Sequence, residues 1–163
     1  MSLDSLEQAI EKLIRTIGHP FTIPFQDIEG IVAGVAYASG DAFGGKFVIH
    51  GVPAVGYIDS VILLDLDDEG INTELWLFDS DFTATADNVA FAISDADLKK
   101  LLWVIRLTNF ADAANNQVAE SNNLDLPYIA PEGLLYCQCV TRGVPNIAAA
   151  NIPMISIRGR SQE

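Results

Sequence analysis

Short segments rich in β-branched and aromatic residues, each bounded by turn residues, run through most of this 163-residue chain. Such segments are typical of β-strands, and the Gly, Pro, Asn and Asp clusters between them are typical of turns. The length is close to that of one domain, so the strands are expected to share one core. The pattern predicts an all-β fold with strands at residues 21–25, 31–38, 46–50, 57–66, 71–78, 88–94, 103–108, 134–141 and 152–158.

Three local patterns refine that prediction. The acidic segment DLDDEG at residues 65–70 is a tight connection in which Gly70 can take positive φ, so the strands on either side of it are predicted to form a hairpin. Ser94 followed by Asp97 resembles a capping box and predicts one short inserted helix. The polar stretch 109–133, rich in Asn and Ala, is predicted to be a long surface connection and a candidate contact segment.

Residues 2–17 carry the clearest helical pattern, and Gly18 and Pro20 end it. The apolar residues recur at spacings of three and four, which places them along one narrow stripe of a helix. A helix this short has only marginal stability alone in water. We therefore expect it to pack either on its own domain or on another protein, as an oligomerisation arm or a clamp. We expect residues 1–20 to form a helical arm and residues 21–163 a β-sandwich domain. The candidate partner-binding residues are Leu3, Leu6, Ile10, Leu13 and Ile17.

The balance of charge limits the kinds of partner. Nine Lys and Arg stand against 22 Asp and Glu, a formal charge of −13, and such a field repels nucleic-acid phosphates and anionic lipid. Neither nucleic acid nor a membrane is therefore an expected partner. The chain shows no signal peptide and no membrane-spanning run, so synthesis and folding in the cytoplasm are expected. Apolar residues make up 50% and charged residues 19%, which predicts that other subunits of a homo-oligomer cover part of the surface.

The two cysteines, Cys137 and Cys139, are separated by one residue on a predicted strand. Their side chains then start roughly 6.5 Å apart on the same face, too far for an unstrained disulfide. A zinc site would need further Cys or His ligands, and the two histidines, His19 and His50, are distant in the sequence. Both thiols are predicted to be reduced and buried in the core.

The segment GDAFGGK at residues 40–46 matches most of a phosphate-binding loop, in which backbone N–H groups and a lysine hold phosphates. However, Phe47 occupies the position where a hydroxyl must bind Mg²⁺. The residues that follow are typical of a strand, not of the helix that such a loop opens. The segment is interpreted as a glycine-rich hairpin turn, and no cofactor is expected.

The carboxylates gather in two predicted turns, residues 65–70 and residues 79–81. The first resembles the opening of a calcium loop, but Trp76 stands where the bidentate glutamate of that loop is required. A looser calcium site between the turns and a glycosidase acid pair stay open as alternatives to solvated turns. Since G-x-S-x-G and H-E-x-x-H are both missing, no catalytic residue or metal ligand is assigned and no enzyme is expected.

The aromatic residues offer one further alternative. Trp76 and Phe78 share a face of one predicted strand, and Trp103 or Tyr128 could lie beside them. Exposed rings would suit stacking on sugars in a lectin-like site, whereas buried rings would belong to the core. Core packing is the favoured interpretation.

Several segments, in this order, are similar to a family of phage and prophage virion proteins encoded among head and tail genes. The segments are YASGD (37–41), GYIDSVILLD (56–65), LWLFDSD (75–81), ADNVAFAISDADLKKLL (86–102), NLDLPY (123–128) and LLYCQCVTRG (134–143). The resemblance spans about residues 37–158 and leaves the N-terminal helix outside it. Some similar proteins are β-sandwich cement proteins that decorate the outside of a capsid. The family brings no catalytic or ligand-binding residue to this chain.

The resemblance implies a bacteriophage capsid decoration or cement protein that binds the outside of the head shell and stabilises it. The expected fold is an all-β, jelly-roll-like β-sandwich with an N-terminal amphipathic helix and one short inserted helix. The expected partners are the major capsid protein and further copies of the chain in a trimer or dimer, and the expected location is the capsid exterior. A carbohydrate-binding virion module, such as part of a fibre or spike, is the alternative, and a glycan hydrolase is a third possibility.

Overall fold

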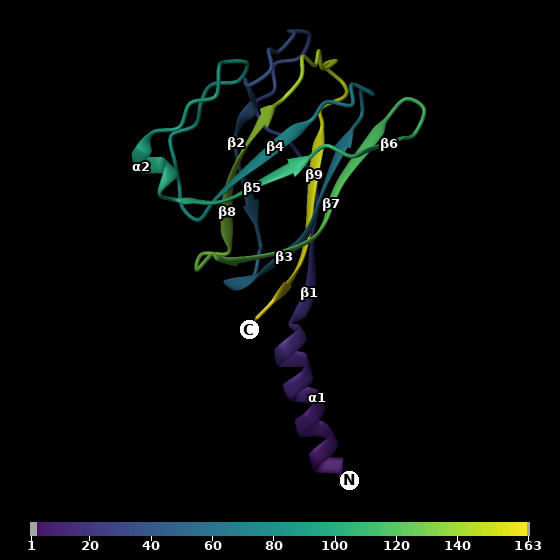
Figure 1. Ribbon diagram of the computed structural model, residues 1–163, viewed down its shortest axis with the longest axis vertical. Coiled ribbons are helices and arrows are strands. Elements are labelled where there is room, and N and C mark those ends of the chain that lie inside the picture. The colour runs from purple at the N-terminus through teal and green to yellow at the C-terminus, as the bar shows by residue number, and fades with distance from the viewer. Residues whose placement is uncertain (1–2, 163) are drawn as a thin grey trace.

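Two antiparallel sheets packed face to face form the body of the protein (Figure 1). The computed structural model describes residues 3–162, apart from the side chains of Glu11 and of residues 13–17. The sheets have the strand orders β1-β9-β3-β7-β6 and β2-β8-β4-β5. In chain order the elements are α1 (Leu3–Ile17), β1 (His19–Asp27), β2 (Ala42–His50), β3 (Val55–Asp65), β4 (Thr73–Phe78), α2 (Asp95–Leu98), β5 (Leu101–Leu107), β6 (Phe110–Asp112), β7 (Gln117–Ile129), β8 (Leu134–Thr141) and β9 (Met154–Ser161).

The strand order is that of a jelly roll. With the short β6 set aside, eight strands divide equally between the sheets, and the first strand, β1, pairs with the last, β9. The second strand, β2, pairs in the same way with β8. The prediction of a jelly-roll-like sandwich with an N-terminal helix and one short inserted helix is confirmed.

The two sheets bury alternating side chains in one shared apolar core. Cys137 and Cys139 lie in this core as free, fully buried thiols, as predicted. Burial raises the pKa of both thiols, so they stay protonated and unreactive. Other core residues facing each other across the sandwich are Val61, Leu63, Leu75, Leu77, Ile155 and Ile157.

A long connection, residues 79–94, crosses the outer face of the β2-β8-β4-β5 sheet and leads into α2 (Figure 1). Phe82 of this connection stacks on Phe78 of β4, with ring centroids 4.0 Å apart. The predicted helix cap is present, because the Ser94 hydroxyl accepts a hydrogen bond from the Asp97 N–H at 3.1 Å. This sheet is therefore buried on parts of both faces.

The glycine-rich segment is a bulge in β2, so its interpretation as a hairpin turn is wrong. The pairing of β2 with β8 shifts between Phe43 and Phe47, which leaves residues 44–46 opposite Gln138. The fully buried Gln138 amide donates hydrogen bonds to the carbonyls of Gly44 and Thr85 and accepts one from the Thr85 N–H. The bulge and the crossing connection are thus fastened to the same side chain.

The predicted hairpin around residues 65–70 is also wrong, because β3 and β4 belong to different sheets. The turn itself forms as expected, and Gly70 has a φ of 58°. The Asp65 carboxylate accepts hydrogen bonds from the N–H groups of Asp67 and Gly70 at 3.0 and 2.8 Å. A tight acidic turn signals that the chain reverses, but it does not determine which sheet receives the next strand.

Three other predicted segments differ from the structure. Residues 31–38 form a loop, and residues 88–94 contribute only an isolated bridge between Ala90 and Asp41. Residues 109–133 contain β6 and β7, so they are not a loop. The polar and strand-breaking residues of β7 are not typical of a strand in the sequence. Its inward side chains nevertheless alternate, at Leu124, Leu126 and Tyr128.

Gly44 and Gly34 provide a matched test of the bulge, since both have positive φ, 81° and 74°. A Cβ at Gly44 would lie 2.7 Å from the Glu29 carbonyl oxygen and from Ile28 Cγ2, whereas a Cβ at Gly34 would meet nothing within 4 Å. We expect Gly44→Ala to lower the free energy of unfolding by about 2–5 kcal/mol and Gly34→Ala by about 1–2 kcal/mol. Urea denaturation would measure both, and equal losses would contradict the packing described here.

Candidate partner-binding surface

The helix α1 projects from one end of the sandwich in line with β1 (Figure 1). The chain leaves the helix through Gly18, which has a φ of 78°. A Cβ at Gly18 would lie 2.2 Å from the carbonyl oxygen of Ser161 in β9, so only glycine fits this junction without a shift of the backbone. Gly18 therefore sets where the arm leaves the body.

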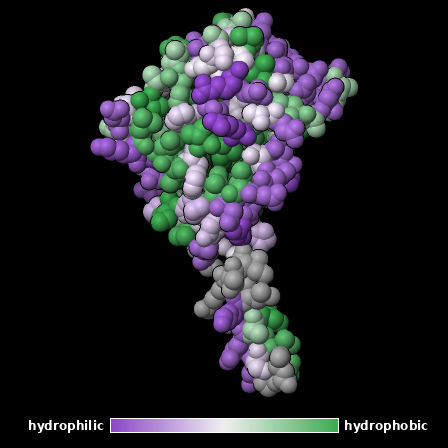
Figure 2. Space-filling view, in the orientation of Figure 1, coloured by the Kyte–Doolittle hydropathy of each residue, from purple (hydrophilic) through white to green (hydrophobic). Residues whose placement is uncertain are grey.

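The arm carries an exposed apolar stripe. Figure 2 shows its apolar side chains along one side and polar ones along the other. Leu3 is 81% exposed, and Leu6 and Ile10 are each 47% exposed. The other predicted stripe residues, Leu13 and Ile17, belong to the same helix, but their side chains lie outside the described part of the structure.

Every α1 side chain that the structure describes is exposed, so this part of the helix does not pack on its own domain. Complete burial of a Leu or Ile side chain is worth roughly 1.5–3 kcal/mol. Three such side chains in water therefore leave several kcal/mol available to a partner that covers them. That the stripe binds a partner remains a prediction.

The two acidic turns do not come together, because they lie at opposite ends of β4. In the first turn the Asp67 carboxylate accepts hydrogen bonds from the Ala148 N–H at 2.6 Å and from Asn151 Nδ2 at 2.9 Å. Within residues 3–162 no three His, Cys, Asp or Glu side chains are grouped so that they could hold a metal ion. The looser calcium site between the turns is therefore not assembled.

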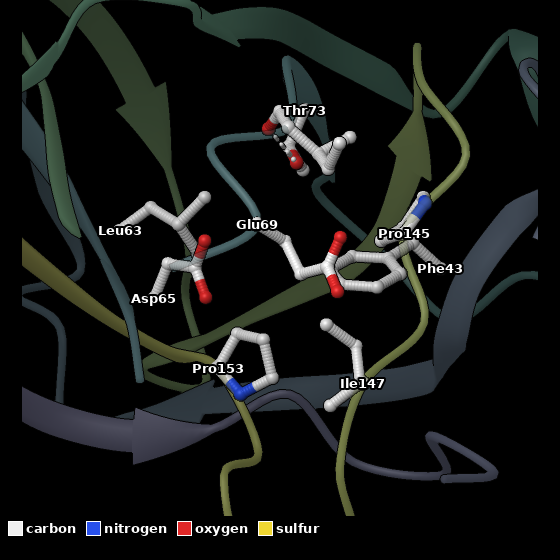
Figure 3. A pocket seen from close by; sticks show the side chains of 9 residues that line it. Phe43, Leu63, Asp65, Glu69, Thr73, Pro145, Ile147 and Pro153 are labelled. Atoms are coloured by element: carbon white, nitrogen blue, oxygen red, sulfur yellow. Dashed lines mark hydrogen bonds between the residues drawn. The ribbon is translucent and has the colours of Figure 1, made fainter. Parts of the chain in front are cut away.

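A narrow space beside the first turn is lined by Asp65 and Glu69 (Figure 3). Figure 3 shows the Glu69 side chain extending toward Phe43 and Pro145. The space measures about 10 Å³, which is about the volume that one water molecule needs. It has no room for a calcium ion with its six to eight oxygen ligands.

In the segment that resembles a phosphate-binding loop, the backbone N–H groups and the lysine already have partners within the fold. The N–H of Gly44 donates to Asp87 Oδ1, and the N–H of Gly45 donates to the Glu29 carbonyl, both at 2.7 Å. Lys46 forms an ion pair with Asp81. Phe47 is buried in the core. These contacts hold the bulge in place instead of leaving the amides free for an anion.

The four aromatic residues considered for sugar stacking do not form one exposed platform. Phe78 and Tyr128 are buried. Trp76 packs against Phe91, with ring centroids 4.8 Å apart. Trp103 donates from Nε1 to the Pro127 carbonyl at 2.9 Å. These rings serve packing, so this particular lectin-like arrangement is absent.

A buried carboxylate, Glu74, lies on the outer face of β4. It accepts hydrogen bonds from Arg142 Nη2 at 2.6 Å and from Trp76 Nε1 at 3.2 Å, and Arg106 Nε lies 3.5 Å from Oε1. Burial raises the pKa of Glu74, but the hydrogen bonds from Arg142 and Trp76 outweigh that effect and hold the pKa below its ordinary value of 4.5. The cluster therefore fastens β4 to the residues that follow β8.

A polar hollow that the sequence did not predict lies on the other sheet. It has a volume of about 720 Å³. Arg160 forms ion pairs with Asp59 and Asp125 there, and its guanidinium lies 4.5 Å from the centre of the Tyr57 ring. The pairing of β3 is irregular at this point. The lining residues are Asp59, Ser60, Asn122, Asn123, Asp125 and Arg160.

Replacement of Glu74 by Gln tests the electrostatic part of this description. Because the folded-state pKa of Glu74 is lowered, its stabilisation is present above pH 4.5 and is lost as the pH falls below that value. We expect the unfolding free energy of the wild type to fall more steeply than that of Glu74→Gln between about pH 5 and pH 3. Urea denaturation across this range would measure the slopes, and parallel curves would contradict the assignment. Glu132→Gln, which removes an exposed acid, controls for net charge.

Within residues 3–162 no helix has the length and apolar character to cross a membrane. No family model, curated protein or solved structure matches this chain.

Proposed function

We propose that the protein is a bacteriophage capsid decoration protein, which binds the outside of the head shell and stabilises it. The observation that carries the proposal is the exposed apolar stripe of α1, held clear of a jelly-roll body. Jelly rolls are common among viral capsid domains. The ordered segments between residues 37 and 158 add support through their resemblance to phage virion proteins.

The arrangement of the arm suits attachment. The sandwich has a core of its own, to which no described α1 side chain contributes. The stripe can therefore be covered by a partner without any change in the body. A protein that binds only the assembled shell lowers the free energy of that state, and many copies with modest contacts add up.

The charge of the chain favours the outer surface. A formal charge of −13 would be repelled by packaged DNA inside the shell. On the outside the same charge aids solubility. The proposal assigns no reaction to the protein, in keeping with its two buried, protonated thiols and with turn acids that accept hydrogen bonds from their own backbone.

Copy number in purified virions tests the proposal directly. Quantitative mass spectrometry would compare this protein with the major shell protein, and an abundance of the same order is expected. A few copies per particle would instead indicate a fibre, spike or connector component. Absence from the virion would refute the decoration role.

The stripe itself is tested by Leu6→Asp, with Gln8→Asp as the matched control on the same helix. A charge in the stripe should reduce the copies bound per virion at least tenfold, because an ionised carboxylate cannot be buried against an apolar partner without a large cost. The control adds the same charge outside the stripe and should bind like the wild type. Equal binding of the two variants would remove the stripe from attachment.

The polar hollow favours a second candidate function, a carbohydrate-binding virion module. Its amides, carboxylates, hydroxyl and guanidinium offer the mixture of hydrogen-bond donors and acceptors that sugar hydroxyls require. Jelly rolls also occur among lectins. This candidate predicts saturable binding of a bacterial surface glycan, weakened at least tenfold by Asp125→Asn and unchanged by Asp68→Asn in the distant turn. Calorimetric titration would measure both, and no saturable binding would exclude it.

A further inference from the structure

We infer that the α1 stripe binds the same stripe of a second copy of this chain, so that two arms form a short coiled coil. The inference rests on the proposed function in taking the stripe as a binding surface, and it names a second copy, in place of the shell, as what covers the stripe, so that the pair would bring two bodies to the shell together. Its test needs no capsid, so the two proposals can fail separately.

The spacing of the stripe is the first argument. From Leu3 to Ile17 the apolar positions alternate at intervals of three and four residues through two heptads. These are the a and d positions of a coiled coil, and Ala9 and Ile14 at flanking positions widen the stripe only on its second half. The a positions are Leu3, Ile10 and Ile17, and the d positions are Leu6 and Leu13.

The distribution of charge is the second argument. In a coiled coil the b, c and f positions face water, and the e and g positions flank the contact. Only one charged residue of α1, Glu7, falls at a flanking position. The other flanking residues are Ala9, Ile14 and Thr16, and the charged residues at b, c and f are Asp4, Glu11, Lys12 and Arg15. Pairing of two arms would therefore cover the stripe and leave nearly all charges hydrated.

The placement of the arm is the third argument. β1, which continues from α1, is the edge strand of its sheet, so within residues 3–162 no strand pairs with its outer edge. The described part of the stripe is uncovered by the body, and a second copy supplies a stripe of identical length and spacing. Ile at a with Leu at d favours two strands. Since two heptads are short, the pairing should strengthen with protein concentration.

Cross-linking through an introduced cysteine tests the contact. Ile10 is at the centre of the stripe, so it lies near its counterpart whether the two arms run parallel or antiparallel. The native thiols, Cys137 and Cys139, are buried, which leaves the introduced thiol as the reactive one. Under mild oxidation of the full chain, Ile10→Cys should form disulfide-linked dimers at least tenfold faster than the control Gln8→Cys. Equal rates would overturn the inference.

Sedimentation velocity supplies an independent measurement. The wild type should approach the mass of two chains as its concentration rises, and Leu6→Asp should remain a single chain. Fluorescence of Trp76 and Trp103, both in the sandwich, would verify that the variant body is folded. A wild type that stays monomeric would overturn the inference, and if Leu6→Asp still lost capsid binding, the stripe would bind the shell directly. A dimer that is absent from virions would support the inference and refute the decoration role.

Discussion

Burial of β8 on both of its faces is the constraint on which the rest of the structure depends. Cys137 and Cys139 face the shared core, whereas Gln138 and Val140 lie on the opposite face and are equally inaccessible. A buried amide without hydrogen bonds costs several kcal/mol, so Gln138 must have partners on that face. The β2 bulge and residue Thr85 supply them. The bulge, the crossing connection and the packing of β8 are therefore one interdependent arrangement.

Acidic side chains hold several of the loops in place, so part of the excess of Asp and Glu in this chain has a structural role. Asp87 accepts hydrogen bonds from the N–H groups of Val32 and Gly44 and from the Tyr37 hydroxyl. Burial of Tyr37 and this hydrogen bond raise the pKa of its phenol. Asp65 closes its own turn in the same manner. These carboxylates accept hydrogen bonds from backbone N–H groups in loops, in turns and in the β2 bulge, where regular strand pairing does not satisfy them.

Local patterns predicted the elements that depend on local chemistry. The strand at 134–141, the cap at Ser94 and the reduced cysteine pair all follow from spacing and composition, and the structure confirms them. The predictions of secondary structure were wrong where contacts with distant parts of the chain determine the conformation. Residues 31–38 have a strand-like composition. However, the Gly34 N–H donates a hydrogen bond to the Ile147 carbonyl, Gly34 has a positive φ, and the segment forms a loop.

The strand β7 and the polar hollow escaped prediction for a related reason. Asn123 and Asp125 have positive φ within the strand, and such residues read as turn formers in a sequence. They lie in an irregular stretch of β7, and β3 pairs with the positions on either side of it, Asn122 and Leu126, so only the folded sheet shows that the strand continues through them. The hollow combines residues from β3, β7 and β9, so no single segment contains its pattern. The stripe of α1 was predictable because it lies within one helix, whereas its exposure was not.

The position of α1 also makes the two ends of the molecule different. Residues 31–38 and 144–151 lie at the end of the sandwich opposite the arm (Figure 1). If the arm is the anchored end, these loops become the outermost surface of the particle and the first that antibodies meet. Gly34, where a side chain would meet open space, would then be a natural point for inserting a foreign peptide, since an insertion there would be displayed at the end opposite the arm.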